Sequence, residues 1–146
     1  IVGTLRQAPG RELSDRLDGL RWYPSLPNPA VRALMREHDV LVLPSLCDAF
    51  GLVVSEALSE GAPVIVSTNV GAADLVEHGH NGFVVPIRDG DAIAQALLAL
   101  RDPDRLAAMS AAAYETARKN PESGIWGETV DWIRSLAGGQ GVPRPV

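Results

Sequence analysis

The centre of the chain alternates short apolar runs with an amphipathic segment. Residues 40–43 (VLVL) and 63–66 (PVIV) carry no charged side chain, and such unbroken runs are typical of parallel strands that are covered on both faces. Between them, Phe50 to Glu60 places apolar and acidic side chains on neighbouring helical turns, and Gly61 is suited to end a helix. The pattern predicts a strand, a helix and a second strand in one βαβ unit.

The segments on either side extend this pattern. A helix is expected at residues 30–37, with Asn28 as its N-cap and Pro29 at its first position. The other expected elements are strands at 1–3, 20–23 and 83–86, a strand-to-helix turn at 67–76, and helices at 12–17, 92–100, 104–119 and 123–136. Together they predict an α/β protein with a parallel sheet and helices on both of its faces.

Length and composition fit one soluble domain. The chain has 146 residues, of which 46% are hydrophobic and 21% charged, and its net charge of −5 with dispersed Lys and Arg argues against nucleic acid as the main partner. We see no signal peptide and no apolar run near the roughly 18 residues of a membrane span, so we expect a cytoplasmic protein. The absence of an initiator methionine suggests a piece of a longer protein: an N-terminally truncated domain at 1–137 and a flexible, Gly/Pro-rich tail at 138–146.

The loop at residues 45–51 is the first candidate site, because it lies between a strand and a helix at the carboxyl edge of the predicted sheet. Gly51 allows close approach of a ligand, and the first N–H groups of the helix favour an anion such as a diphosphate. Those N–H groups belong to Gly51, Leu52 and Val53. Glu56 follows at roughly 7–8 Å along the helix, where a ribose would lie, and its carboxylate suits two neighbouring hydroxyls. Asp48 is a second carboxylate facing the same opening.

The same residues form a longer motif. It reads D-x-F-G-L-x-x-x-E from Asp48 to Glu56 and continues as A-x-x-x-G-x-P-V-I from Ala57 to Ile65. This motif resembles the donor-binding motif of retaining glycosyltransferases of group 1 (family 4). The resemblance implies that Glu56 contacts the nucleotide ribose and that Asp48, as the catalytic-site residue, lies near the transferred sugar. The substrate-binding residues implied between them are Phe50, Gly51 and Leu52. Asp48 departs from the family, which usually has the longer Glu at this place.

A second turn extends the resemblance. Gly71 and Ala72 lie in a segment similar to the glycine-rich turn of this family, which is followed by an acidic residue. We expect their backbone N–H groups to face the sugar or the phosphate. Ala72 and Asp74 stand where the family tends to have Gly and Glu, and alanine adopts a positive φ less readily than glycine.

The resemblance implies a Rossmann-like domain, the C-terminal donor-binding half of a GT-B fold. The expected enzyme is a retaining, metal-independent hexosyltransferase that moves a sugar from a nucleoside diphosphate sugar to an unknown acceptor. The donor is a substrate, and no cofactor or metal is expected. The N-terminal, acceptor-binding domain of the same protein would be the missing partner, and the fragment alone should be inactive. The alternative is a non-catalytic Rossmann-like module that binds a nucleotide or nucleotide sugar; no G-x-G-x-x-G follows a strand, which speaks against NAD.

Each acidic residue of the motif also has a simpler explanation, since Asp48 is suited to cap the helix and Glu56 to lie on its surface. The motif as a whole favours the binding role for both residues. Three further features have simple explanations that we prefer. Arg32 and Arg36 fit a solvated helix face better than a phosphate site, the pair His78 and His80 lacks a third metal ligand, and Cys47 has no histidine near it to make it a nucleophile.

Overall fold

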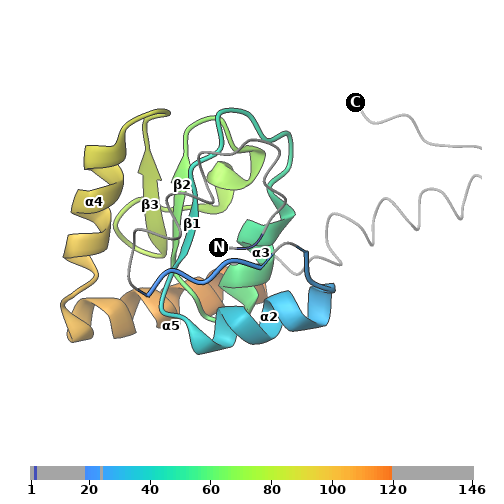
Figure 1. Ribbon diagram of the computed structural model, residues 1–146. Helices are drawn as coiled ribbons and strands as arrows, with labels where there is room; N and C mark the ends of the chain where they lie inside the picture. The colour runs from blue at the N-terminus through green and yellow to red at the C-terminus, as the bar shows by residue number, and fades with distance from the viewer. Residues whose placement is uncertain (1, 3–18, 24, 120–146) are drawn as a thin grey trace, which may run out of the picture.

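Three parallel strands form the sheet at the centre of the molecule (Figure 1). The structure is a computed structural model that describes residue 2, residues 19–23 and residues 25–119. The strands are β1 (Leu41–Leu43), β2 (Val64–Ser67) and β3 (Gly82–Val85), in this spatial order. Leu41 lies opposite Val64, which lies opposite Gly82. The predicted parallel sheet is confirmed, and all three strands end at the same edge.

Helices connect and flank these strands. They are α2 (Asn28–Glu37), α3 (Leu52–Ser59), the 3₁₀ helix η1 (Gly71–Leu75), α4 (Gly90–Ala99) and α5 (Pro103–Lys119). Helix α3 joins β1 to β2, as the βαβ pattern predicts, and η1 joins β2 to β3. In place of the expected strand at 20–23, the structure has an isolated parallel bridge between Val2 and Tyr23. The expected strand at 1–3 otherwise lies outside the described residues, as do the helices at 12–17 and 123–136 and the tail.

The predicted cap of the second helix is wrong. Helix α2 begins at Asn28 itself, and Pro27 precedes it in extended conformation. The carbonyl oxygen of Pro27 accepts hydrogen bonds from the N–H groups of Ala30 (2.9 Å) and Val31 (3.1 Å), so the helix starts without a side-chain cap. The Asn28 side chain points elsewhere, to a residue of α3.

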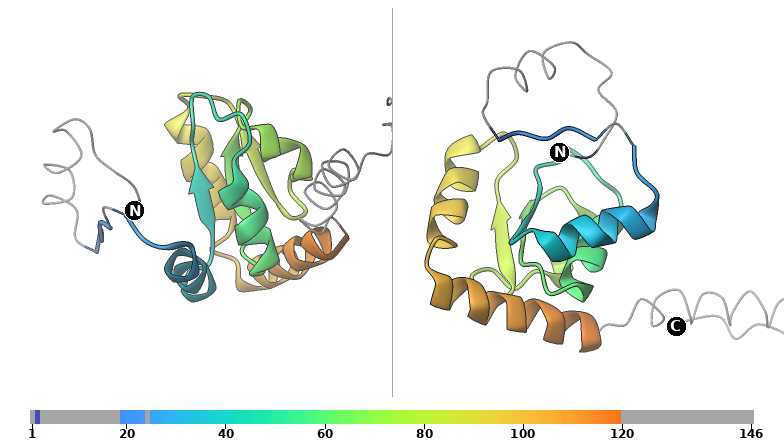
Figure 2. Two further views of the ribbon diagram at one scale, coloured as in Figure 1. Left: turned by 90° about the vertical axis from the view of Figure 1, so that its right-hand side faces the viewer. Right: turned by 60° about the horizontal axis from the view of Figure 1, so that its bottom comes forward.

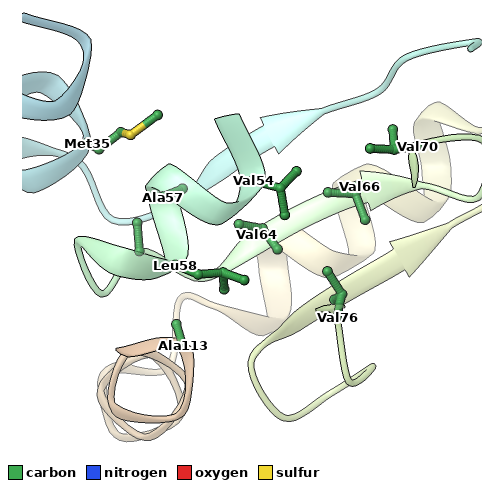
Figure 3. Packing of buried hydrophobic residues seen from close by; sticks show 10 residues of the cluster. Met35, Val54, Ala57, Leu58, Val64, Val66, Val70, Val76 and Ala113 are labelled. Carbon is green, nitrogen blue, oxygen red and sulfur yellow. The ribbon is translucent and has the colours of Figure 1, made fainter. Parts of the chain in front are cut away.

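One face of the sheet packs against α3. Val64 and Val66 of β2 are fully buried beneath Val54 and Leu58 of α3, as Figure 3 shows. Ala113 of α5 belongs to the same cluster. These residues fill the space between helix and sheet with small and branched side chains, and removing the buried Leu58 side chain would cost about 2–5 kcal/mol.

The other face of the sheet packs against α4. Ile65 points away from its neighbours on β2 and joins Phe83 and Val85 of β3, which contact Ala96 of α4 and Met109 of α5. Helix α5 runs from below α4 to below α3 and so closes one end of both clusters (Figure 2). Both faces of the strands are covered, which explains why their sequences are apolar without alternation. The predicted three-layer α/β architecture with a Rossmann-like sheet is confirmed.

Candidate functional site

Two loops at the carboxyl edge of the sheet are bonded to each other. The loop after β1 and the loop after β2 exchange three backbone hydrogen bonds: Asp48 N–H to Asn69 C=O (3.0 Å), Gly71 N–H to Asp48 C=O (2.9 Å) and Ala72 N–H to Phe50 C=O (2.9 Å). They continue the β1–β2 pairing beyond the ends of the strands. The edge that carries the predicted site is therefore built by both loops.

Side chains hold the base of these loops in place. The buried hydroxyl of Ser67, the last residue of β2, donates to the carbonyl oxygen of Ser45. The Asn69 side-chain amide donates to the carbonyl oxygen of Leu46 at 3.0 Å. Each bond satisfies a backbone acceptor that strand pairing leaves open, so the loop after β1 is fixed before any ligand arrives.

Two glycines allow the loops to approach this closely. Gly51 has a φ of +65°, and a Cβ added to it would lie 2.5 Å from Cγ1 of Val70. A Cβ added to Gly71 would lie 2.2 Å from the carbonyl oxygen of Ala49. We predicted that Gly51 makes room for a ligand; its backbone conformation and its contact with Val70 show that the fold itself requires glycine there.

Asp48 lies in the loop ahead of α3 and is partly exposed. Its Oδ1 accepts hydrogen bonds from the N–H groups of Phe50 (3.1 Å) and Gly51 (2.7 Å). One carboxylate oxygen thus orders the turn into the helix, which is the simpler explanation for this residue. Its Oδ2 accepts from no group of the described chain. Contact of Asp48 with a sugar stays a prediction.

At the N-terminal end of α3, two N–H groups have no partner among the residues that the structure describes. Gly51 N–H is not one of them, contrary to our expectation, because it donates to Asp48. Val54 N–H donates to the carbonyl oxygen of Gly51 at 2.8 Å. Within residues 25–119, no protein group accepts from the N–H groups of Leu52 and Val53, which lie at the positive end of the helix dipole. This end of the helix has the properties of an anion site.

Glu56 follows Leu52 by four residues and shares its helix face. Its carboxylate is partly exposed, and its Oε1 accepts a hydrogen bond from Nδ2 of Asn28 at the start of α2. Oε2 has no protein partner among the described residues. The structure therefore places a carboxylate with one open oxygen roughly 6 Å along the helix from the unpaired N–H groups. The contact of Asn28 with this candidate residue was not predicted from the sequence, because its pattern indicated only a cap.

The second predicted turn does not offer the N–H groups that we expected. The N–H groups of Gly71 and Ala72 both donate to the loop after β1, and Ala73 N–H donates to Val70 C=O at 2.9 Å. Ala72 lies in η1 with negative φ, so it does not need the conformation that favours glycine. The free N–H groups predicted for Gly71 and Ala72 are therefore wrong, whereas a contact of these residues with substrate stays a prediction.

Arg32 and Arg36 of α2 lie far from the start of α3. Both bind Glu60, which follows the last residue of α3: Nε of Arg32 lies 2.7 Å from Oε1 and Nη1 of Arg36 lies 2.9 Å from Oε2. Hydrogen bonds from Arg36 and then from Arg32 lower the pKa of Glu60, against the opposing effect of burial. The two arginines thus join α2 to the C-terminal end of α3 while Arg36 stays exposed, so the solvated-face interpretation is right about exposure but did not include the ion pairs with Glu60.

The other candidate residues show no reactive arrangement. Nδ1 of His78 lies 3.2 Å from the N atom of Val84, and its ring stands edge-on to Phe83 with centroids 5.4 Å apart. Among the described residues, no three His, Cys, Asp or Glu side chains lie close enough together to hold a metal ion. Cys47 is exposed and unpaired with another cysteine. No helix within the described residues has the length and apolar character needed to cross a membrane.

A family model and several curated proteins are similar to this chain in sequence. The family model described as glycosyl transferases group 1 matches residues 1–102. A D-inositol 3-phosphate glycosyltransferase of Thermobispora bispora is 38% identical over 103 residues, which cover 70% of this chain and 24% of the relative. An Escherichia coli UDP-Gal:alpha-D-GlcNAc-diphosphoundecaprenol alpha-1,3-galactosyltransferase is 37% identical over 98 residues, covering 67% of this chain and 24% of that enzyme. The chain thus spans about a quarter of the length of these relatives.

Solved structures show the same fold. A sucrose-phosphate synthase of Thermosynechococcus elongatus matches with a TM-score of 0.80 at 23% identity, over 94% of this chain and 38% of that one. HepE of Anabaena, solved with UDP-glucose, has a TM-score of 0.74 at 22% identity, over 88% and 35% of the two chains. The C-terminal domain of the group 1 protein LpcC of Francisella tularensis has a TM-score of 0.67 at 20% identity, over 75% and 60%. The chain belongs to the group 1 glycosyltransferase family and has the fold of the C-terminal domain of its GT-B members.

Proposed function

We propose that this chain is the nucleotide-sugar donor-binding domain of a retaining, metal-independent hexosyltransferase. The observation that carries the proposal is the start of α3, where the unpaired N–H groups of Leu52 and Val53 precede the carboxylate of Glu56 on one helix. An anion at the helix start and a diol one turn further along match the diphosphate and the adjoining ribose of a nucleoside diphosphate. UDP is the first nucleotide to test, since HepE was solved with UDP-glucose and the E. coli relative is named for UDP-Gal.

The chemistry of the leaving group fits this arrangement. When the sugar leaves, negative charge grows on the diphosphate, and fixed N–H donors at a helix start stabilise that charge without having to reorganise. Glu56 would accept hydrogen bonds from the ribose hydroxyls through its open Oε2. Asp48 would use its open Oδ2 to orient a hydroxyl of the transferred sugar, while its Oδ1 keeps the loop in place.

A nucleotide titration tests donor binding. Amide shifts of the isotopically labelled chain would be followed by NMR as UDP, GDP or ADP is added. We expect one nucleotide to shift the amides of Leu52, Val53 and Glu56 saturably, and Glu56→Ala to weaken binding by about tenfold through loss of the ribose contact. Glu115→Ala removes the same charge from the exposed face of α5 and should leave the affinity unchanged. Absence of these shifts with all three nucleotides at millimolar concentration would contradict the proposal.

The alternative is a domain that binds a nucleotide sugar without transferring the sugar. The observation that favours it is the engagement of Asp48 Oδ1 by Phe50 and Gly51, since Asp is shorter than the Glu that the family usually has. A transfer assay on a protein that carries both domains distinguishes the two. Release of UDP from UDP-glucose that Glu56→Ala reduces about tenfold at a low concentration of UDP-glucose supports the transferase. Tight UDP binding without any release of UDP, even with added acceptors, supports the binding module.

A further inference from the structure

The Asn28 side chain forms a hydrogen bond with Glu56. Its Nδ2 donates to Oε1 of Glu56 across 28 positions of sequence. The start of α2 does not need this side chain, because the carbonyl oxygen of Pro27 already accepts from the N–H groups of Ala30 and Val31. Within the part of the chain that the structure describes, the bond to Glu56 is the hydrogen bond that this side chain makes. An exposed Asn that neither caps nor supports its own helix points to a role at its partner.

Asn28 is held on a rigid support. Helix α2 is fastened to α3 by the ion pairs of Arg32 and Arg36 with Glu60 and by the buried side chain of Met35. Asn28 and Glu56 therefore lie on two helices, α2 and α3, whose relative position is fixed by these contacts. Under these conditions one hydrogen bond restrains the rotamers of the glutamate.

We propose that Asn28 is the positioning residue for Glu56 and prepares its carboxylate for the ribose of a nucleoside diphosphate, an inference that rests on the proposed function. A free glutamate loses rotamer freedom when a ligand fixes it, and holding the side chain in advance removes part of that cost from binding. The neutral amide occupies Oε1 without cancelling the negative charge. Oε2 stays open for the hydroxyls.

If Asn28 positions Glu56, it should affect binding of the ribose and not binding of an anion at the start of α3. The N–H groups of Leu52 and Val53 belong to the backbone of α3 and do not involve Asn28. A ligand that lacks ribose should therefore be indifferent to a change at residue 28. A purely structural role, in which Asn28 steadies α2 against α3, predicts instead that binding of every ligand weakens.

The experiment compares UDP with inorganic pyrophosphate by NMR titration of the whole chain. We expect Asn28→Ala to weaken UDP binding threefold to tenfold and to leave pyrophosphate binding unchanged. Asn28→Asp, which has the same shape but places a second carboxylate beside Glu56, should weaken UDP binding at least tenfold. Gln95→Ala, an exposed amide removed from α4, is the control for the loss of a surface amide. The thermal midpoint of Asn28→Ala should equal that of the unsubstituted chain.

The double variant decides whether Asn28 acts through Glu56. In a Glu56→Ala background, Asn28→Ala should cause no further loss of UDP affinity, because the residue that it positions is gone. An unchanged UDP affinity in Asn28→Ala, an equal loss for pyrophosphate, or a full loss in the Glu56→Ala background would each overturn the inference. Failure of the unsubstituted chain to bind any nucleotide would overturn the proposed function itself, so the two failures are distinguishable.

Discussion

Helix α3 ends in opposite ways at its two termini. At its C-terminal end the carbonyl oxygens of Ala57 and Leu58 are satisfied by the protein: Glu60 N–H and Ala62 N–H donate to Ala57 C=O at 3.1 and 2.9 Å, and Gly61 N–H donates to Leu58 C=O at 3.0 Å. Two arginines from α2 then bind the side chain of Glu60. At the N-terminal end, the N–H groups of Leu52 and Val53 have no acceptor in the described chain.

The difference shows how one helix serves both stability and binding. Cations near a helix C-terminus stabilise it through the dipole, and here the same cations tie α2 to α3. At the positive end the Asp48 carboxylate compensates the dipole in part, because it accepts from Gly51 N–H, while the N–H groups of Leu52 and Val53 have no acceptor among the described residues. The fold is therefore fastened at one end of α3 and left ready for an anion at the other.

The largest loss of stability is expected for Gly71→Ala, which disrupts the contact between the loops after β1 and β2 at the N-terminal end of α3. The new Cβ would lie 2.2 Å from the carbonyl oxygen of Ala49, so two bonded loops would have to separate. We expect a loss of about 3 kcal/mol or more in the free energy of unfolding, measured by urea denaturation. At Gly90 an added Cβ meets nothing within 4 Å, which makes Gly90→Ala the control. Equal stability of both variants would show that the loops are not closely bonded.

These contacts mark the limit of what the sequence predicts. The strands were predictable because an apolar run covered on both faces is visible in the run itself, as in residues 63–66. The functional assignment of Glu56 came from the motif, since a partly exposed glutamate on a helix has no distinguishing pattern. The contacts of Gly71 with Ala49 and of Asn28 with Glu56 depend on how distant loops and helices meet, which local spacing does not encode.

The arginine pair illustrates the same limit. Arg32 and Arg36 are four residues apart, so their common face on a helix was predicted correctly. Their partner Glu60 lies beyond the next strand and helix, at a place set by the packing of α2 on α3. The sequence therefore indicated a cationic face and not the carboxylate that occupies it.

Two substitutions of Asp48 separate the effect of its hydrogen bonds from the effect of its charge on the loop after β1. Asp48→Ala removes the acceptor for Phe50 and Gly51 N–H, and we expect a loss of about 1–2 kcal/mol in unfolding free energy. Asp48→Asn keeps a side-chain oxygen for these bonds and should retain most of the stability. If both variants lose the same stability, the charge of Asp48 rather than its hydrogen bonds holds the loop.

The contribution of the ion pairs at the C-terminal end of α3 to stability is tested by Glu60→Gln and by changing the pH. We expect a loss of about 1 kcal/mol at neutral pH, a modest value because the Arg36 side chain is 55% exposed and its charge is screened by water and salt. Arg36 and Arg32 hold the pKa of Glu60 below its ordinary value of 4.5. A carboxylate with a lowered pKa stabilises the fold above that ordinary value, and this stability is lost as pH falls through the folded-state pKa.

Measurements at low pH are the control for the Glu60→Gln prediction. Protonated Glu60 resembles Gln, so the difference in unfolding free energy between the unsubstituted chain and Glu60→Gln should shrink on acidification and in high salt. Urea denaturation at several pH values measures it. A difference that stays constant from neutral to acid pH would show that the ion pairs do not contribute to stability.

The smallest free energy is expected for the binding of inorganic pyrophosphate at the N-terminal end of α3. A helix start contributes about 0.3–1 kcal/mol to the binding of an exposed anion, so inorganic pyrophosphate should bind α3 weakly and with strong dependence on salt. Helix α4 is the control within the same molecule, because the carboxylates of Asp89 and Asp91 lie at its start and repel an anion, and Oδ1 of Asp89 already accepts from Ala92 N–H at 2.9 Å. Amide shifts in an NMR titration should therefore appear at Leu52 and Val53 and not at Asp91 and Ala92. Equal shifts at both helices would mean that pyrophosphate responds to any helix start, and that the open end of α3 is not a site prepared for a diphosphate.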